Sequence, residues 1–211
     1  SNHRIVEWKK DATYGRIVAG GNGEGQRNDQ LNYPQSMIVD YQTDSLIICD
    51  SNNRRVVLWP RQNGTSGATI ISDVKCWDLV MDNHRYLYVS DTEKHEVRRW
   101  KIGETNGTLV AGGNGKGDRL NQFDGSRYIC VDQDQTVYVS DNRNHRVMKW
   151  LKGAKEGIVV AGGNGSGSSL SQMYYPSRIM VDSLGTIYVV DSANHRIVRW
   201  LNEAKEGSII V

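Results

Sequence analysis

Short apolar runs recur along the chain and are separated by glycine-rich or polar segments. Helical spacing never persists over the roughly 10–12 residues that a helix needs, so the pattern predicts short strands. Each unit starts with an unbroken apolar run, which predicts a first strand buried on both faces. The first strands are expected around residues 37–39, 79–81, 129–131 and 179–181.

Three further strands complete each unit. The second strand carries Tyr or Ile and ends in Asp, at Asp50, Asp91, Asp141 and Asp191. The third alternates apolar with charged residues and ends in Trp, at Trp8, Trp59, Trp100, Trp150 and Trp200. The fourth is short and apolar, as in residues 157–160. Four strands that grade from buried to half-exposed are typical of one propeller blade, so the pattern predicts an all-β propeller of four-stranded antiparallel blades.

A glycine-rich repeat, Val-Ala-Gly-Gly-Asn-Gly-x-Gly, follows the fourth strand at residues 18–25, 110–117 and 160–167. It is missing between Ile71 and Trp77, which explains why one interval between Trp residues is shorter than the others. We expect a single partial propeller over residues 1–211, with a half-blade at 1–19. The four blades are predicted at about 35–71, 76–111, 126–161 and 177–211.

The turn before the third strand resembles the NHL repeat. Its motif, Asn-His-Arg followed by Ile or Val, stands at residues 2–5, 144–147 and 194–197. Residues 53–56 lack the His, and residues 94–97 keep only the His. The resemblance implies a propeller that is mostly six-bladed in the family, so about four and a half of a probable six blades are expected here. The strands missing from the half-blade would come from a longer parent chain or from self-association, and an unusual five-fold closure of the ring is the remaining alternative.

Composition narrows the function classes. The chain has 26 Lys and Arg residues against 24 Asp and Glu residues. The resulting net charge of +2 does not by itself indicate a nucleic-acid-binding protein. No apolar run approaches the ~18 residues of a membrane span. The three Cys residues cannot all pair within the chain, and we expect no closed disulfide framework. Cys49 and Cys130 are interpreted as small buried hydrophobes, and Cys76 precedes a first strand.

The glycine-rich loop at residues 112–118 superficially suggests a phosphate loop. A phosphate loop needs Lys followed by Ser or Thr and then a helix, whereas Gly117 follows Lys116 here. Gly117 also occupies the place where a calcium-binding repeat would need Asp. We interpret the loop as a turn whose Gly and Asn residues supply positive φ, and expect no cofactor.

Each of three turns carries an Asp and a His four residues apart, and both side chains are metal-ligand types. Because each pair lies in a turn of its own blade, we interpret them as structural residues that hold the turn, with no metal site and no catalytic residue. They are Asp91, His95, Asp141, His145, Asp191 and His195.

Binding sites are usually built from what differs between repeats, and the residues at the mouths of the first strands differ. They are aromatic, basic or polar, and Tyr and Arg suit interface anchors. The candidate binding-face residues are Tyr33, Gln35, Trp77, Asp78, Arg127, Tyr128, Tyr174, Tyr175 and Arg178.

These features predict a non-catalytic scaffold that binds protein partners through the face carrying the glycine-rich and Asn-His-Arg loops. Two alternatives stay open by resemblance. The chain could be part of a propeller enzyme, similar to the peptide-amidating lyase or to lactonases, with its metal site in blades outside this sequence. It could instead be an RNA-binding NHL domain. A third hypothesis is that the repeats have a purely structural role. The sequence does not indicate a cellular compartment.

Overall fold

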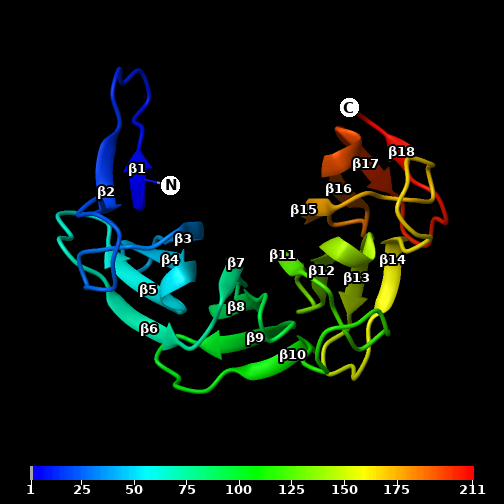
Figure 1. Ribbon diagram of the computed structural model, residues 1–211, viewed down its shortest axis with the longest axis horizontal. Coiled ribbons are helices and arrows are strands. Elements are labelled where there is room, and N and C mark those ends of the chain that lie inside the picture. The colour runs from blue at the N-terminus through cyan, green and yellow to red at the C-terminus, as the bar shows by residue number, and fades with distance from the viewer. Residues whose placement is uncertain (1) are drawn as a thin grey trace. The chain divides into compact units, whose positions relative to one another are not determined.

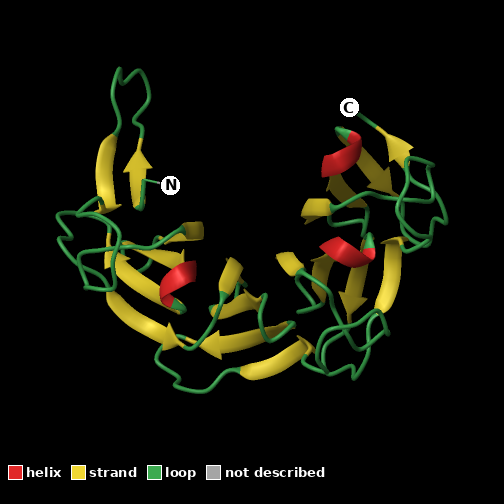
Figure 2. Ribbon diagram, viewed as in Figure 1, coloured by secondary structure: helices red, strands yellow, loops and turns green. Residues whose placement is uncertain are grey.

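The computed structural model describes residues 2–211, which form 18 strands and three short 3-10 helices. The strands fall into five antiparallel sheets (Figure 1, Figure 2). The first sheet has two strands, β1 (Arg4–Glu7) and β2 (Arg16–Gly20). The second has four, β3 (Pro34–Asp40), β4 (Ser45–Asp50), β5 (Arg55–Pro60) and β6 (Ala68–Ser72).

Three more four-stranded sheets follow. The third sheet contains β7 (Cys76–Met81), β8 (Tyr86–Asp91), β9 (Glu96–Lys101) and β10 (Thr108–Gly112). The fourth contains β11 (Ser126–Val131), β12 (Val137–Asp141), β13 (Arg146–Trp150) and β14 (Ile158–Gly162). The fifth contains β15 (Pro176–Val181), β16 (Ile187–Asp191), β17 (Arg196–Trp200) and β18 (Ser208–Ile209).

Strands that follow one another in sequence are neighbours in every sheet, as in a propeller blade. The predicted fold class, four-stranded antiparallel blades preceded by two extra strands, is confirmed. The chain divides into two compact units, residues 1–79 and 80–211, and the boundary lies within β7. Each unit is described by itself below.

The Trp at the end of the third strand lies in a blade core in three of the sheets, at Trp59, Trp150 and Trp200. Trp150 is 1% exposed and its ring lies 4.8 Å from that of Phe123, beside Ile129 and Val137. Trp8, at the same place in the two-stranded sheet, is 64% exposed. The inner strands that supply Val137 and Ile129 to Trp150 have no counterpart in that sheet, so one face of the Trp8 ring stays open.

The burial expected for the first strands is wrong in part. The second strand β4 is buried along its whole length, whereas β3 is half-buried except at Asp40. Met180 in β15 is 58% exposed. The reason is topological, because a first strand pairs with a neighbour on one side only, while a second strand lies between two.

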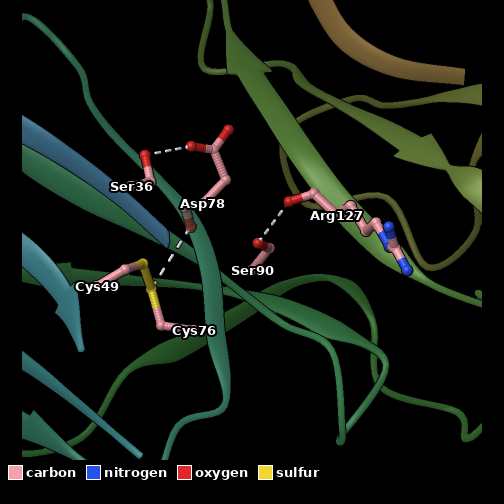
Figure 3. The surroundings of a disulfide bond; sticks show 6 residues. All are labelled: Ser36, Cys49, Cys76, Asp78, Ser90 and Arg127. Carbon is pink, nitrogen blue, oxygen red and sulfur yellow. Dashed lines mark hydrogen bonds between the residues drawn. A yellow bond between two sulfur atoms is a disulfide. The ribbon is translucent and has the colours of Figure 1, made fainter. Parts of the chain in front are cut away.

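Cys49 is fully buried as expected, but its interpretation as a simple hydrophobe is wrong because it is paired. Cys49 in β4 and Cys76 in β7 form a disulfide, with their Cα atoms 5.4 Å apart (Figure 3). Cys130 is the free cysteine of the described residues and is half-buried. Both cysteines lie in the unit of residues 1–79. The disulfide joins β4 to β7, a first strand that is not preceded by a glycine-rich loop.

Candidate functional site

The Asp that recurs at the end of each second strand is a hydrogen-bond hub. Asp141 lies fully buried and accepts hydrogen bonds from the Asp124 N–H (2.8 Å), from Asn144 Nδ2 (2.8 Å) and from Arg146 Nε (2.8 Å). Burial raises the pKa of Asp141 to about 6, against the opposing effects of Asn144 and Arg146. Both oxygens of this carboxylate are therefore occupied, Oδ1 by the loop that precedes β11 and Oδ2 by the turn and β13.

The Arg of the Asn-His-Arg motif ties the glycine-rich loop to the blade that follows it. Arg146 donates through its terminal nitrogens to the carbonyl oxygens of Asp118 (2.7 Å), Arg119 (3.0 Å) and Gln122 (3.2 Å). The Asp–Asn–Arg arrangement and its loop contacts together are called the loop clip below. The same clip recurs around Asp50 and Arg55 and around Asp191 and Arg196.

The sheet β7–β10 breaks this pattern. Glu96 stands where the other sheets have the clip Arg, and it bonds to Arg98 (2.7 Å) instead. Asp91 accepts the backbone N–H groups of Glu93 and Lys94. No glycine-rich loop enters this sheet, so there are no loop carbonyls for an Arg to bind.

The His of the motif contacts the loop that enters the next blade. His145 takes a left-handed conformation (φ 54°), and its Nδ1 accepts a hydrogen bond from the Tyr175 N–H (3.2 Å). Tyr174 and Tyr175 stack with ring centroids 4.8 Å apart, and His145 lies edge-on to both. Burial lowers the pKa of His145, and Asp191 opposes that shift. His3 accepts the Tyr33 N–H (3.2 Å) in the same way.

A polar hollow of about 460 Å³ lies between the mouths of β11 and β15. Its lining combines three predicted candidates with four polar residues: Arg127, Tyr128, Asn142, Arg143, Tyr175, Ser177 and Ser192. We call these seven residues the polar hollow. They come from two first strands, from the turns after two second strands and from the end of a glycine-rich loop, so the repeat architecture brings them together.

Several contacts fix the shape of the polar hollow. The Arg178 guanidinium lies 4.9 Å from the centroid of the Tyr128 ring, a cation–π distance. The Tyr128 N–H donates to Ser140 Oγ (3.1 Å), and Arg143 pairs with Asp124 at 3.5 Å. The guanidinium groups and phenols provide hydrogen-bond donors on a rigid sheet frame.

The structure brings together five of the nine predicted binding-face residues. Arg127, Tyr128 and Tyr175 line the polar hollow, while Tyr174 and Arg178 stack on two of them. The other four lie in the unit of residues 1–79: Tyr33, Gln35, Trp77 and Asp78. Among these, Asp78 is 1% exposed and accepts a hydrogen bond from Ser36 Oγ (2.6 Å), as Figure 3 shows. Its carboxylate is used within that unit.

Sequence reasoning missed Asn142, Arg143 and Ser192 as lining residues. They occupy the 3-10 turns η2 (Asn142–Asn144) and η3 (Ser192–Asn194), which directly follow the hub Asp residues. The signal that could have found them is variation inside the repeat, because the turn reads Asn-Arg-Asn in one blade and Ser-Ala-Asn in the next.

Within residues 2–211, no group of three or more His, Cys, Asp or Glu side chains lies close enough to hold a metal ion. Within the same range, no helix has the length and apolar character needed to cross a membrane.

Comparison with solved structures defines the class of the fold. The chain superposes on a gluconolactonase from Xanthomonas campestris with a TM-score of 0.64, at 13% identity, over 85% of this chain and 62% of that one. A streptogramin B lyase gives 0.60 at 14% identity, over 83% and 53%. An auxiliary nutrient binding protein from Bacteroides thetaiotaomicron gives 0.66 at 17% identity, over 95% and 59%. No curated protein sequence matches the chain.

These likenesses establish the fold, a β-propeller built from four-stranded blades. The chain spans 53–62% of the length of the three proteins above. The sequence identifies the repeat more closely. Residues 129–150 and 173–200 match the NHL repeat family, so the chain carries NHL repeats in its fourth and fifth sheets.

Proposed function

We propose that this chain is a non-catalytic scaffold that binds a protein partner through the polar hollow. The observation that carries the proposal is the convergence of Arg127, Tyr128, Arg143 and Tyr175 on one hollow of about 460 Å³. Arg and Tyr are the residue types that most often dominate protein interfaces. The hollow lies on the face formed by the Asn-His-Arg turns and the ends of the glycine-rich loops.

The chemistry of the hollow favours a partner segment that offers hydrogen-bond acceptors. Its guanidinium groups are donors only, whereas its asparagine amide and serine hydroxyls can serve as either donor or acceptor. Tyr175 is 41% exposed and offers an aromatic surface held in place by Tyr174 and His145. An acidic peptide segment with an apolar residue would match both properties.

The test is a peptide-display selection on the wild-type chain, followed by fluorescence anisotropy with the selected peptides. Tyr175→Ala and Arg143→Ala should each weaken binding by about five- to thirtyfold, because a truncated interface anchor costs about 1–2 kcal/mol. Lys155→Ala, in an exposed turn away from the hollow, is the matched control and should bind normally. Equal affinity for all four proteins would refute the proposal.

Two other outcomes would favour the alternative functions. Binding of a single-stranded RNA that is lost in the same variants would redirect the assignment to RNA recognition. Stoichiometric zinc or calcium in the protein isolated with all its blades would support a metal-dependent propeller enzyme.

A further inference from the structure

A second kind of cavity lies at the outer side of the blades, where the third and fourth strands of one sheet face the third strand of the next. Two such cavities occur in the unit of residues 80–211. One lies between the sheets β7–β10 and β11–β14 and measures about 280 Å³. The other lies between the sheets β11–β14 and β15–β18 and measures about 560 Å³. We call them the small and the large interblade cavity.

The two cavities are lined by the same positions of the repeat. Each has a second-strand Tyr, a third-strand cation, apolar residues of the outer strand, and the Trp-Leu pair of the next blade. In the small cavity these include Tyr88, Arg99, Leu109, Trp150 and Leu151. In the large cavity they include Tyr138, Lys149, Val159, Trp200 and Leu201.

Two equivalent positions differ between the cavities, Gln135 against Gly185 and Arg99 against Lys149. In the small cavity, Gln135 bridges Arg99 and Asp82, with Arg99 donating to Gln135 Oε1 (3.2 Å) and Gln135 Nε2 donating to Asp82 Oδ2 (2.8 Å). Arg99 also lies 4.3 Å over the Tyr86 ring. In the large cavity, Gly185 replaces this Gln. The bridging side chain is gone, and the space it would fill is open.

The cation of the large cavity has no ionic partner among the described residues. Lys149 is half-buried, and its ammonium group lies 5.7 Å from the centroid of the Tyr138 ring. A half-buried ammonium group is strongly attracted to an anion that can approach it. Two lysines, Lys149 and Lys205, line the cavity against a single acid, Glu203.

Part of the remaining wall of the large cavity is apolar, and the polar side chains of Asn164, Asn202 and Glu203 complete it. Ile158 is 53% exposed, Val159 is 36% exposed and Leu201 is 56% exposed, and all three line it. Its volume lies within the ~300–1,000 Å³ typical of small-molecule sites, which combine apolar walls with a few polar groups. An apolar surface beside one half-buried cation complements an apolar body that ends in a single negative charge.

From these observations we propose that the large interblade cavity binds a small apolar carboxylic acid. The carboxylate would pair with Lys149, and the hydrocarbon body would cover Ile158, Val159 and Leu201. The site is independent of the polar hollow, since the two share no lining residue.

The experiment uses decanoate as the probe, titrated into the full chain by isothermal calorimetry and into a ¹⁵N-labelled sample by NMR. We expect one bound decanoate, with shifts of the Gly185 amide. Lys149→Met should weaken binding by about tenfold or more, because a charge-assisted contact is worth about 1.5–3 kcal/mol. Decanol should bind both proteins equally, since it has no charge to pair. Lys155→Met is the matched control and should bind decanoate normally.

Two reciprocal variants test the structural argument. Gly185→Gln restores the residue of the small cavity and should abolish binding. This variant should fold, because Gln135 takes the same positive φ (62°) and a Cβ at Gly185 would meet nothing closer than 3.8 Å. The double variant Arg99→Lys/Gln135→Gly should open the small cavity and raise the stoichiometry to two.

Four results would overturn the proposal. They are no heat or NMR shift with millimolar decanoate, an unchanged Kd in both Lys149→Met and Gly185→Gln, a stoichiometry that stays at one in the double variant, and binding of peptide C-termini but not of the free acid.

Discussion

Replacing Arg146 with Met removes the cation from a buried loop clip while keeping most of the side-chain volume. The change deletes the 2.8 Å bond to Asp141 and three bonds to loop carbonyls. Removing one partner of a buried ion pair costs about 3–5 kcal/mol, mainly because the other charge stays buried. The loop carbonyls are part-buried and can recover water, so we expect a loss of about 3–5 kcal/mol in total.

The loss should depend on pH. Because burial raises the pKa of Asp141 from 3.8 to about 6, the folded state holds this proton to higher pH than the unfolded state does. The free energy of unfolding therefore falls as the pH rises through this window. Without Arg146 the pKa of Asp141 rises further, so the penalty should be largest near pH 8 and smaller at pH 5, where the carboxyl can be neutral.

The assay is urea unfolding at pH 5 and pH 8, followed by tryptophan fluorescence and far-UV circular dichroism. Hydrogen exchange of the Gly117 amide, which bonds to the Phe123 carbonyl, reports on the loop itself. Asp141→Asn/Arg146→Met should be less destabilising than Arg146→Met alone, since the buried charge is removed too. The control Arg16→Met breaks an exposed pair with Glu7 and should cost about 0–1 kcal/mol.

A cost below about 1 kcal/mol for Arg146→Met would refute the view that this side chain holds the loop. A cost that is equal at pH 5 and pH 8 would show that the uncompensated carboxylate is not its main source.

Three further predictions follow from the same structure. Reducing the Cys49–Cys76 disulfide, which spans a sequence separation of 27, should lower stability by about 3–4 kcal/mol on the chain-entropy account, measured by unfolding with and without reductant. Gly162→Ala should cost about 2 kcal/mol or more, since a Cβ there would lie 2.5 Å from the His145 carbonyl, whereas Gly165→Ala meets nothing within 4 Å and should cost about 1–2 kcal/mol of backbone strain. Burial lowers the pKa of His145 below its ordinary value of 6.5. The stability that the neutral His145 ring contributes is therefore complete above pH 6.5 and is lost as the pH falls below that value. Faster hydrogen exchange of the Tyr175 amide, which donates to His145 Nδ1, should reveal this loss.

Much of the fold was predictable because each blade repeats the same local rules. The alternation of apolar and charged residues before Trp150 and Trp200 predicted third strands, and the structure places strands there. The candidates Arg127, Tyr128 and Tyr175 were found because they vary where the repeat is otherwise constant, and they line one hollow. Their role in binding stays a prediction.

What the sequence could not supply depends on contacts between distant segments. Cys49 and Cys76 belong to different sheets, and their pairing requires the position of β7 beside β4, which no local pattern encodes. The large interblade cavity depends on Gly185, which has no side chain to fill the space. This becomes clear only when Gly185 is compared with Gln135 at the equivalent position of the small cavity. The burial of first strands was misjudged because apolar sequence does not reveal how many neighbours a strand has.

The loop clip makes the glycine-rich loop and its arginine a unit that a blade has or lacks as a whole. The loop and its Arg are far apart in sequence, since Arg146 binds carbonyls 24–28 residues before it. Without the Arg these carbonyls lose their donor, and without the loop the Arg loses their acceptor oxygens. The blade that lacks the loop also lacks the Arg and carries Glu96 there. To graft a ligand-binding loop onto this fold, the loop and its distant arginine should therefore be exchanged together.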